Sequence, residues 1–308
     1  MNYADLHCDT PLEMFDRGES LASGSLNVIL DKLGFCKKYL QLAAYCPNEN
    51  IGDDEGYEKF LRVRDNFLNE CTKVGASVAK SADELKSSVD AGKPTFVLTL
   101  EDGRVLSGSL SRLHKLYESG VRVLTPLWGG ETCIGGSHQS TAGLTKFGRD
   151  VAELCGELGV ITDISHASER SANEILEIAG LHGRPVIASH SCSATLNPHS
   201  RNLSDDLLRK TARSGGIVGV NFYPPHLTGG TATLLDVVRH VKHYVSIVGD
   251  GHVALGCDFD GMGIFPEDAH DVTAVERLYS LMAEDGFSNE ALEKIFFTNA
   301  YDFLINNL

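Results

Sequence analysis

A histidine and an aspartate stand two positions apart near the start of the chain, in the segment Tyr3-Ala4-Asp5-Leu6-His7-Cys8-Asp9-Thr10. Alternate side chains of a β-strand point to the same face, so His7 and Asp9 can reach one ion together. An imidazole nitrogen and a carboxylate oxygen are ordinary ligands of zinc and similar divalent metals. Taken alone, the pair fits equally well a histidine that ends a strand and an aspartate that begins a turn.

The same residue types recur where later apolar segments end. In chain order, the polar residues at these ends are His7 and Asp9, Glu101 and Asp102, Asp163 and His166, His190, Asn221 and Tyr223, and Asp258 and Asp260. In a barrel of parallel strands the carboxyl ends of all strands meet on one face, where the catalytic groups of such folds lie. We therefore expect a metal site with three histidines and two or three carboxylates on this face.

The apolar segments predict eight strands, because each is bounded by glycine, proline or polar residues. They span residues 1–8, 39–46, 93–101, 121–128, 159–166, 184–190, 216–223 and 252–259. Segments with helical periodicity lie between them, at 57–74, 82–91, 109–119, 144–158, 169–179, 204–214 and 234–248. We predict an α/β fold, a (β/α)8 barrel of the TIM type with extra C-terminal helices, as a single domain over residues 1–308. Periodicity alone does not exclude a doubly wound sheet.

The composition limits the classes of partner. The chain has 308 residues, 42% of them hydrophobic, and a formal net charge of -15. Nucleic-acid backbones and anionic membrane surfaces repel such a charge, so neither is expected as a partner. The sequence has neither a basic and then apolar leader nor an apolar run of about eighteen residues, so we expect a cytoplasmic location.

The number of metal ions stays open at this point. Four ligands from the first, fifth and sixth strands, with one carboxylate, could serve a single ion. Histidines on two sides of a barrel suit a pair of ions, with Glu101 between them as a bridge. Two ions about 3.5–4 Å apart can share a hydroxide, lower its pKa and polarise a substrate carbonyl. Asp258, after the last strand, would then carry the proton.

Longer segments around these residues carry a family resemblance. They are Asp5–Thr10, Leu98–Gly103, Gly143–Gly148, Thr162–Ser168, Arg184–Ser191, Ser200–Leu203, Val220–Tyr223 and Gly256–Gly261. In content and order they resemble the membrane (renal) dipeptidase family, dinuclear zinc peptidases within the amidohydrolase-like barrels. The resemblance covers nearly the whole chain.

The resemblance implies two zinc ions per chain, with His7 and Asp9 as ligands of one, His166 and His190 as ligands of the other, and Glu101 as the bridge. It also implies that Asp258 shuttles the proton, and that Arg201 and Tyr223 bind the carboxylate of the C-terminal residue of a dipeptide. The planar guanidinium of arginine can hold a carboxylate through two hydrogen bonds. The implied activity is a metallo-dipeptidase that tolerates a D-residue at this position, and family members are often homodimers.

One position departs from the family pattern. Vertebrate members carry a histidine at the end of the fourth strand that helps to polarise the scissile carbonyl, whereas this chain has Trp128 there. An indole N–H can donate a hydrogen bond but cannot carry a charge. Either Trp128 shapes the pocket and zinc alone stabilises the oxyanion, or His138 acts as the donor. We favour the first hypothesis, because a loop histidine more often faces solvent.

Other residues that could do chemistry receive structural interpretations. The eight cysteines form no C-x-x-C pair, so we expect reduced thiols, with Cys46 among those that act as small hydrophobic residues. The glycine-rich segment 129–136 lacks the Lys-Ser/Thr ending of a phosphate loop and is expected to form a flexible rim. Surface or capping roles are expected for six further histidines, namely His114, His182, His240, His243, His252 and His270.

Two alternatives to a dipeptidase remain. Another barrel hydrolase, such as a cyclic amidase or a deaminase, would not need Arg201 and Tyr223. A barrel that binds metal or ligand without turnover is the second alternative, and the presence of every expected metal ligand and of Asp258 disfavours it.

Overall fold

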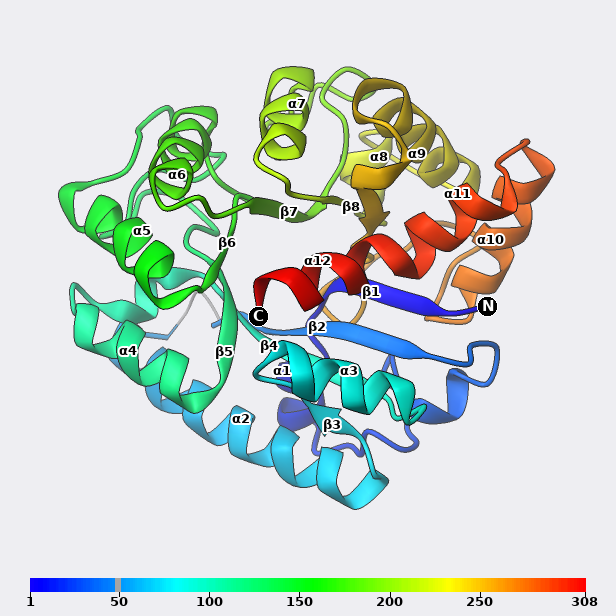
Figure 1. Ribbon diagram of the computed structural model, residues 1–308, viewed down its shortest axis with the longest axis horizontal. Helices are drawn as coiled ribbons and strands as arrows, with labels where there is room; N and C mark the ends of the chain where they lie inside the picture. Colours follow the sequence, from blue (N-terminus) through cyan, green and yellow to red (C-terminus); the bar gives the residue numbers. More distant parts are fainter. Residues whose placement is uncertain (48–50) are drawn as a thin grey trace.

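The structure is a computed structural model that describes residues 1–47 and 51–308. Within these ranges, nine strands form one parallel sheet that curls into a ring with helices outside it (Figure 1). The strands are β1 (Tyr3–Cys8), β2 (Tyr39–Tyr45), β3 (Ser77–Val78), β4 (Thr95–Glu101), β5 (Val121–Thr125), β6 (Ile161–Asp163), β7 (Val186–Ser191), β8 (Val218–Val220) and β9 (Val253–Leu255).

Eight of the described strands follow one another around the ring in the order β1-β2-β4-β5-β6-β7-β8-β9, and the short β3 pairs with β4 outside this path. The ring closes where β1 meets the residues after β9. Cys8 and Phe259 form a parallel bridge there, and the Asp258 amide donates to the His7 carbonyl over 2.9 Å. The predicted (β/α)8 barrel of the TIM type is therefore confirmed.

Helices surround the barrel. Those of the described chain are α1 (Thr10–Arg17), α2 (Asp53–Val74), α3 (Ala82–Asp90), α4 (Leu110–Ser119), α5 (Lys146–Leu158), α6 (Glu169–Leu181), α7 (Asp205–Arg213), α8 (Pro224–Leu227), α9 (Leu234–Val248), α10 (Ala274–Glu284), α11 (Asn289–Glu293) and α12 (Asn299–Asn307), with shorter turns η1 (Leu30–Lys32), η2 (Gly103–Leu106), η3 (Asp250–His252) and η4 (Lys294–Thr298). Local sequence explains their limits. Helix α2, for example, has three acidic residues in its first turn and ends at Gly75, which adopts a φ of 72°. None of the described helices is both long enough and apolar enough to span a membrane.

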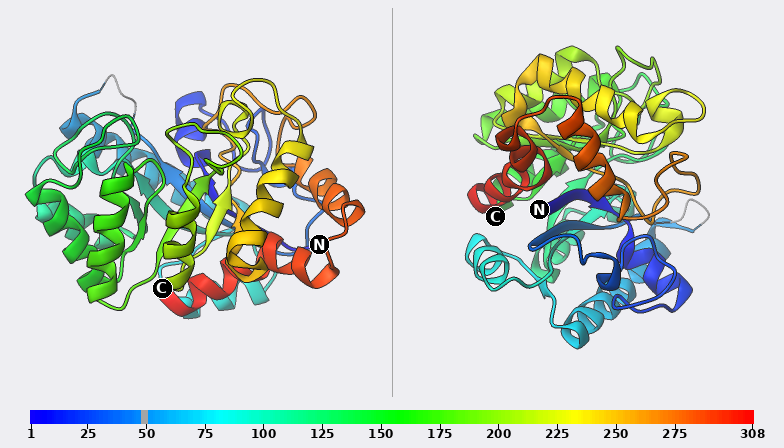
Figure 2. Two further views of the ribbon diagram at one scale, coloured as in Figure 1. Left: turned by 90° about the horizontal axis from the view of Figure 1, so that it is seen from above. Right: turned by 90° about the vertical axis from the view of Figure 1, so that its right-hand side faces the viewer.

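Two apolar cores hold the barrel together. The larger one lies between the sheet and the outer helices, and the smaller one fills the inside of the barrel. The inner core includes Leu6, Leu42, Val97, Val123, Ile161, Ile187 and Ile217 from the strands, with Phe297, Phe303 and Leu304 from the C-terminal helices. Helix α12 thus covers one end of the barrel, and α1 lies at the opposite end (left view of Figure 2). The open end is where the strands finish.

The observed elements differ from the predicted ones mainly at the strand ends. The last regular residues of β6 and β9 are Asp163 and Leu255, several residues before the predicted limits of 166 and 259. Within the predicted limits, His166 and Asp258 adopt left-handed φ angles of 67° and 66°, which a regular strand does not contain. Helix α1 was not predicted, although Pro11 in its first turn and Gly18 after its end are ordinary helix limits.

Candidate metal centre

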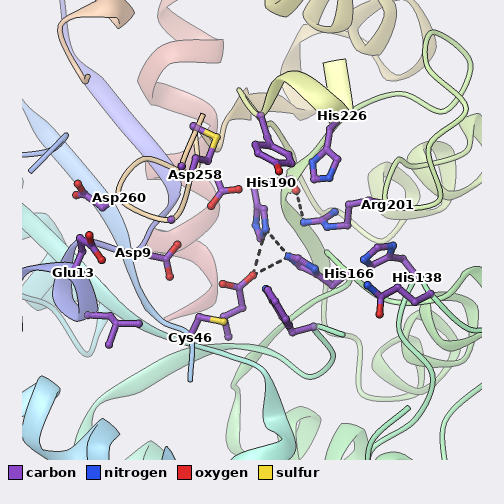
Figure 3. A pocket seen from close by; sticks show the side chains of 18 residues that line it. Asp9, Glu13, Cys46, His138, His166, His190, Arg201, His226, Asp258 and Asp260 are labelled. Atoms are coloured by element: carbon purple, nitrogen blue, oxygen red, sulfur yellow. Dashed lines mark hydrogen bonds and ion pairs between the residues drawn. The ribbon is translucent and has the colours of Figure 1, made fainter. Parts of the chain in front are cut away.

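The open end of the barrel contains a pocket of about 500 Å³. Its walls bring together nearly all of the sequence-predicted site residues (Figure 3). The pocket is lined by Asp9, Leu12, Glu13, Cys46, Glu101, Trp128, His138, Gln139, His166, His190, Arg201, Tyr223, His226, Asp258, Asp260, Gly261, Met262 and Gly263. His7 is fully buried directly behind this surface, where its imidazole contacts Asp9 and Glu101.

Glu101, the last residue of β4, lies between two groups of potential ligands. Its Oε2 is 3.2 Å from His7 Nε2, which in turn is 3.5 Å from Asp9 Oδ2. Its Oε1 is 2.9 Å from His166 Nε2 and 3.3 Å from His190 Nε2. Each carboxylate oxygen of Glu101 therefore faces a different set of side chains, as a bridging carboxylate would.

The donor set fits divalent metal ions. Three groups have donor atoms within 4.8 Å of one another, namely His7, Asp9 and Glu101; Glu101, His166 and His190; and His7, His190 and Asp258. Among the described residues, the buried Asp9 Oδ1 has no hydrogen-bond partner, and His7 Nε2 and Glu101 Oε1 have only other candidate ligands close to them. Buried polar atoms without partners are costly, and imidazoles with carboxylates are the usual ligands of zinc. These atoms are consistent with a site built for cations.

The pKa values show how strongly the groups interact. Burial works against a charged His7, yet the carboxylates of Glu101 and Asp9 raise its pKa well above the ordinary value. Burial disfavours the Glu101 carboxylate, but His7, His166 and His190 hold its pKa well below the ordinary value. Burial and the charge of Arg201 lower the pKa of His166 to about 3. His166 is therefore a neutral imidazole at pH 7, the form that binds a metal.

Residues behind the pocket orient His190. Its Nδ1 lies 2.8 Å from Ser189 Oγ, and Ser189 Oγ donates to Asp163 Oδ2 over 2.5 Å. Because the serine proton goes to the carboxylate, Ser189 Oγ can accept the Nδ1 proton of His190, which leaves the Nε2 lone pair directed at Glu101. Asp163 also accepts hydrogen bonds from Thr125 Oγ1 and the backbone amide of Ser165, over 2.7 and 2.9 Å. It thereby links β5, β6 and β7.

Asp258 lines the pocket close to Asp9 and Glu101. Its Oδ2 accepts a hydrogen bond from Asn221 Nδ2 over 2.9 Å, and burial, with the nearby Asp9 and Glu101 carboxylates, raises its pKa to about 7. A glycine is required beside it, because a Cβ on Gly261 would lie 2.7 Å from Asp258 Oδ1 and 2.2 Å from Asp9 Oδ2. The arrangement suits an acid or base that exchanges protons near neutral pH.

Arg201 lies across the pocket from Asp9, Glu13 and Asp260 (Figure 3), and Tyr223 also lines the pocket. The guanidinium of Arg201 is 3% exposed and donates to Ser191 Oγ and to the His190 carbonyl, each over 2.7 Å. Its Nε has no hydrogen-bond partner among the described residues. No described carboxylate forms an ion pair with it, so a buried positive charge is available to a ligand.

Trp128 and His138 also reach the pocket. The Trp128 ring stacks on His166 with centroids 5.9 Å apart, and the His138 ring lies 5.9 Å from the same imidazole. His138 Nδ1 is 3.0 Å from Ser200 Oγ, and burial with the charge of Arg201 lowers the pKa of His138 to about 4. Trp128 is therefore close enough to shape the pocket, and His138 is close enough to be the alternative donor.

Three residues have roles that the sequence did not indicate. Cys46 lines the pocket and contacts Glu101, where burial and that carboxylate raise the pKa of its thiol well above the ordinary value. His226, on α8, also lines the pocket. His240 is 1% exposed, so the expected surface role is wrong. Its ring joins the Ser193 amide to the Leu227 carbonyl at the end of α8, which is a capping contact. Its position on an amphipathic helix gave no signal, because the partners come from distant loops.

Comparisons with known proteins identify the family of the chain. Residues 1–303 match the family model described as membrane dipeptidase (peptidase family M19). The chain belongs to this family. The predicted resemblance is thereby confirmed, and membership implies a metal-dependent peptidase. The candidate ligand groups lie at the barrel mouth.

Three individual proteins show how similar this M19 chain is to known proteins. An uncharacterised protein of Klebsiella pneumoniae is 32% identical over 66% of the chain and 79% of that relative. Dipeptidase tcpJ of Claviceps purpurea is 32% identical over 71% of the chain, which spans 52% of that relative's length. A metallo peptidase from Rhodobacter sphaeroides, solved with a phosphinate mimic of the dipeptide L-Ala-D-Ala, has a TM-score of 0.91 and 23% identity, covering 100% of this chain and 99% of that one. The last likeness shows a shared fold.

Proposed function

We propose that this chain is a zinc-dependent dipeptidase that hydrolyses the peptide bond of dipeptides, including those with a D-residue at the C-terminus. The observation that carries the proposal is the position of Glu101 between two sets of potential ligands. Each of its two carboxylate oxygens faces one set in the same pocket. Family membership and the names of the relatives support the same activity.

Two zinc ions are part of the proposal. His7 and Asp9 would hold one ion and His166 and His190 the other, with Glu101 between them. When bound, the ions supply Lewis acidity and lower the pKa of a water molecule. The chain's own contribution is to orient His190 through Ser189 and Asp163 and to enclose the reaction in a pocket.

The charges of the pocket support one orientation of the substrate. Arg201 lies at one end, and Asp9, Glu13, Asp258 and Asp260 lie at the other (Figure 3). A dipeptide carries a carboxylate at its C-terminus and an ammonium group at its N-terminus. We infer that Arg201 and Tyr223 bind the carboxylate and that the acidic end receives the ammonium group, which positions the peptide bond near Glu101.

Asp258 is the proposed proton carrier. It takes a proton from the attacking water and delivers it to the nitrogen of the leaving amino acid, so one water is consumed and one C–N bond breaks. A pKa raised to about 7 by burial, Asp9 and Glu101 is suited to both steps. Trp128 shapes the pocket beside His166, and His138 is the alternative donor to the oxyanion.

The test is a matrix of L,L and L,D dipeptides incubated with the zinc-loaded protein, with release of free amino acids as the measurement. Hydrolysis of dipeptides and not of cyclic amides would support the proposal. The opposite pattern would favour an amidase, and no turnover of either class would favour a binding protein. A cytoplasmic location and a homodimer stay predictions, to be checked by cell fractionation and by sedimentation.

A further inference from the structure

His226 lies beside Arg201 in the pocket wall that receives the carboxylate in the proposed function (Figure 3). It belongs to α8, the short helix that follows Tyr223. Its imidazole packs edge to face against Tyr223, with centroids 4.8 Å apart, and its other neighbour is His199 at 4.9 Å. The ring therefore adjoins the two residues assigned to the C-terminal carboxylate.

The backbone of α8 is held in place by side chains from elsewhere. Asn197 and Asn202 donate to the His226 carbonyl over 3.0 and 2.8 Å. His240 Nε2 donates to the Leu227 carbonyl over 2.9 Å, because its Nδ1 accepts the amide proton of Ser193 over 3.0 Å. Several distant residues thus fix the position of His226, as expected for a side chain that contacts a ligand.

The imidazole itself has no such support. Its Nδ1 is buried and has no hydrogen-bond partner among the residues that the structure describes. A phenyl ring would pack equally well against Tyr223 and His199 without the cost of an unpaired polar nitrogen. Folding alone therefore does not explain why the ring at position 226 is polar.

The charges around His226 favour an anion. Arg201 and His199 are polar neighbours of His226. The acidic residues of the pocket lie at the other end from Arg201 (Figure 3). Burial, together with the charge of Arg201, lowers the pKa of His226 well below its ordinary value, so the free protein has a neutral ring there. One substrate carboxylate at Arg201 balances its charge, and a second nearby carboxylate would accept a hydrogen bond from the N–H of the neutral imidazole.

We propose that His226 contacts the side chain of the substrate's C-terminal residue and that the enzyme prefers dipeptides ending in aspartate or glutamate. The inference rests on the proposed function, because it takes the orientation of the dipeptide from Arg201. His226 is then a specificity-determining residue and takes no part in the chemical step.

The test compares kcat/KM for Ala-Asp, Ala-Asn and Ala-Ala, each with the stereochemistry that the dipeptide matrix selects. Aspartate and asparagine have nearly the same shape, so their ratio isolates the charge. We expect the wild type to prefer Ala-Asp over Ala-Asn by about tenfold or more, mainly through KM, because a hydrogen bond to a charged group is lost. In His226→Phe this ratio should fall towards one, whereas His226→Gln, which keeps a donor, should retain part of it.

The matched control is His114→Phe, the same change at an exposed position on α4. It should keep the wild-type ratio. Equal rates on Ala-Asp and Ala-Asn in the wild type would overturn the inference without any variant, and would leave the dipeptidase proposal intact if Ala-Ala is hydrolysed. A uniform loss on all three substrates in His226→Phe would likewise reduce His226 to a packing residue. Failure of the zinc-loaded protein to hydrolyse any dipeptide would overturn the proposed function and this inference together.

Discussion

The imidazoles of His7 and His190 lie against each other with centroids 3.8 Å apart and an angle of 31° between their planes. The two residues come from β1 and β7, strands that are not neighbours in the ring. Each belongs to a different ligand group around Glu101. The two groups are therefore in contact, and a change in one should be felt by the other.

The first prediction concerns the number of ions. The purified protein should contain two divalent ions per chain and lose activity to chelators. Glu101→Gln should lower the content of both metal ions, because the neutral amide removes the charge that faces both ligand groups. Elemental analysis of wild type and variant is the measurement. A fully active chain with one ion or fewer would contradict the dinuclear site.

The second prediction concerns Asp258. Asp258→Asn should lower kcat by about 10²–10⁴, the usual range for a positioned acid or base. Metal content should stay at the wild-type level, since Asn221 can still hold the side chain in place. Steady-state kinetics combined with metal analysis checks this. Near-normal kcat would remove Asp258 from the proton transfer.

The third prediction concerns Arg201. Free dipeptides should be hydrolysed better than the same dipeptides with an amidated C-terminus, because amidation removes the charge that Arg201 binds. The expected loss is on the order of 1.5–3 kcal/mol, roughly ten- to hundredfold in kcat/KM. Arg201→Met should lose this discrimination. If the wild type treats both substrates alike, the amidase alternative gains support.

The fourth prediction concerns His138. If Trp128 only shapes the pocket, His138→Ala should leave kcat nearly unchanged. If His138 donates to the oxyanion, kcat should fall by about 10²–10³ with the metals intact. We expect the first result, and Trp128→Phe, which keeps the ring but removes the donor, serves as the companion variant.

The fifth prediction concerns His240. His240→Ala should lower the free energy of unfolding by about 2–4 kcal/mol, because a buried ring and two buried hydrogen bonds are lost. It should also raise KM, since the Leu227 carbonyl and the Ser193 amide lose their shared partner. Denaturant unfolding and dipeptide kinetics measure the two effects. Exposed His114→Ala should change stability by less than about 0.5 kcal/mol.

Much of the site could be predicted because parallel strands end together. Glu101 and His190 lie at the ends of long buried strands, β4 and β7, where the pattern of apolar residues is clear. Asp9 was predictable as the partner of His7 from their spacing together with the recurrence of metal-binding residue types at later strand ends. Their prediction depends on local periodicity and on one rule of barrel geometry, that the carboxyl ends of the strands meet on one face.

Other features depend on backbone geometry that the sequence does not display. His166, Asp258 and Asp260 adopt left-handed conformations that cost energy for residues other than glycine. Asp260, moreover, accepts hydrogen bonds from Thr10 Oγ1 and the Asn27 amide, over 2.8 and 2.6 Å, which fixes a loop far away in the chain. The contact of Cys46 with Glu101 depends in the same way on where a strand ends, and residue type alone could not reveal it.

The seam between β1 and β9 has a consequence for folding. Asp5 accepts the Cys257 amide over 2.9 Å, and the His7 carbonyl accepts the Asp258 amide, so the first and last strands join beside the ligands. Contacts between residues this far apart in sequence form late and slowly, because long loops must close first. Metal affinity should therefore appear at the final step of folding. A cation bound there would stabilise the closed barrel. Its removal should speed amide hydrogen exchange in β1 and β9 before it does so in the other strands.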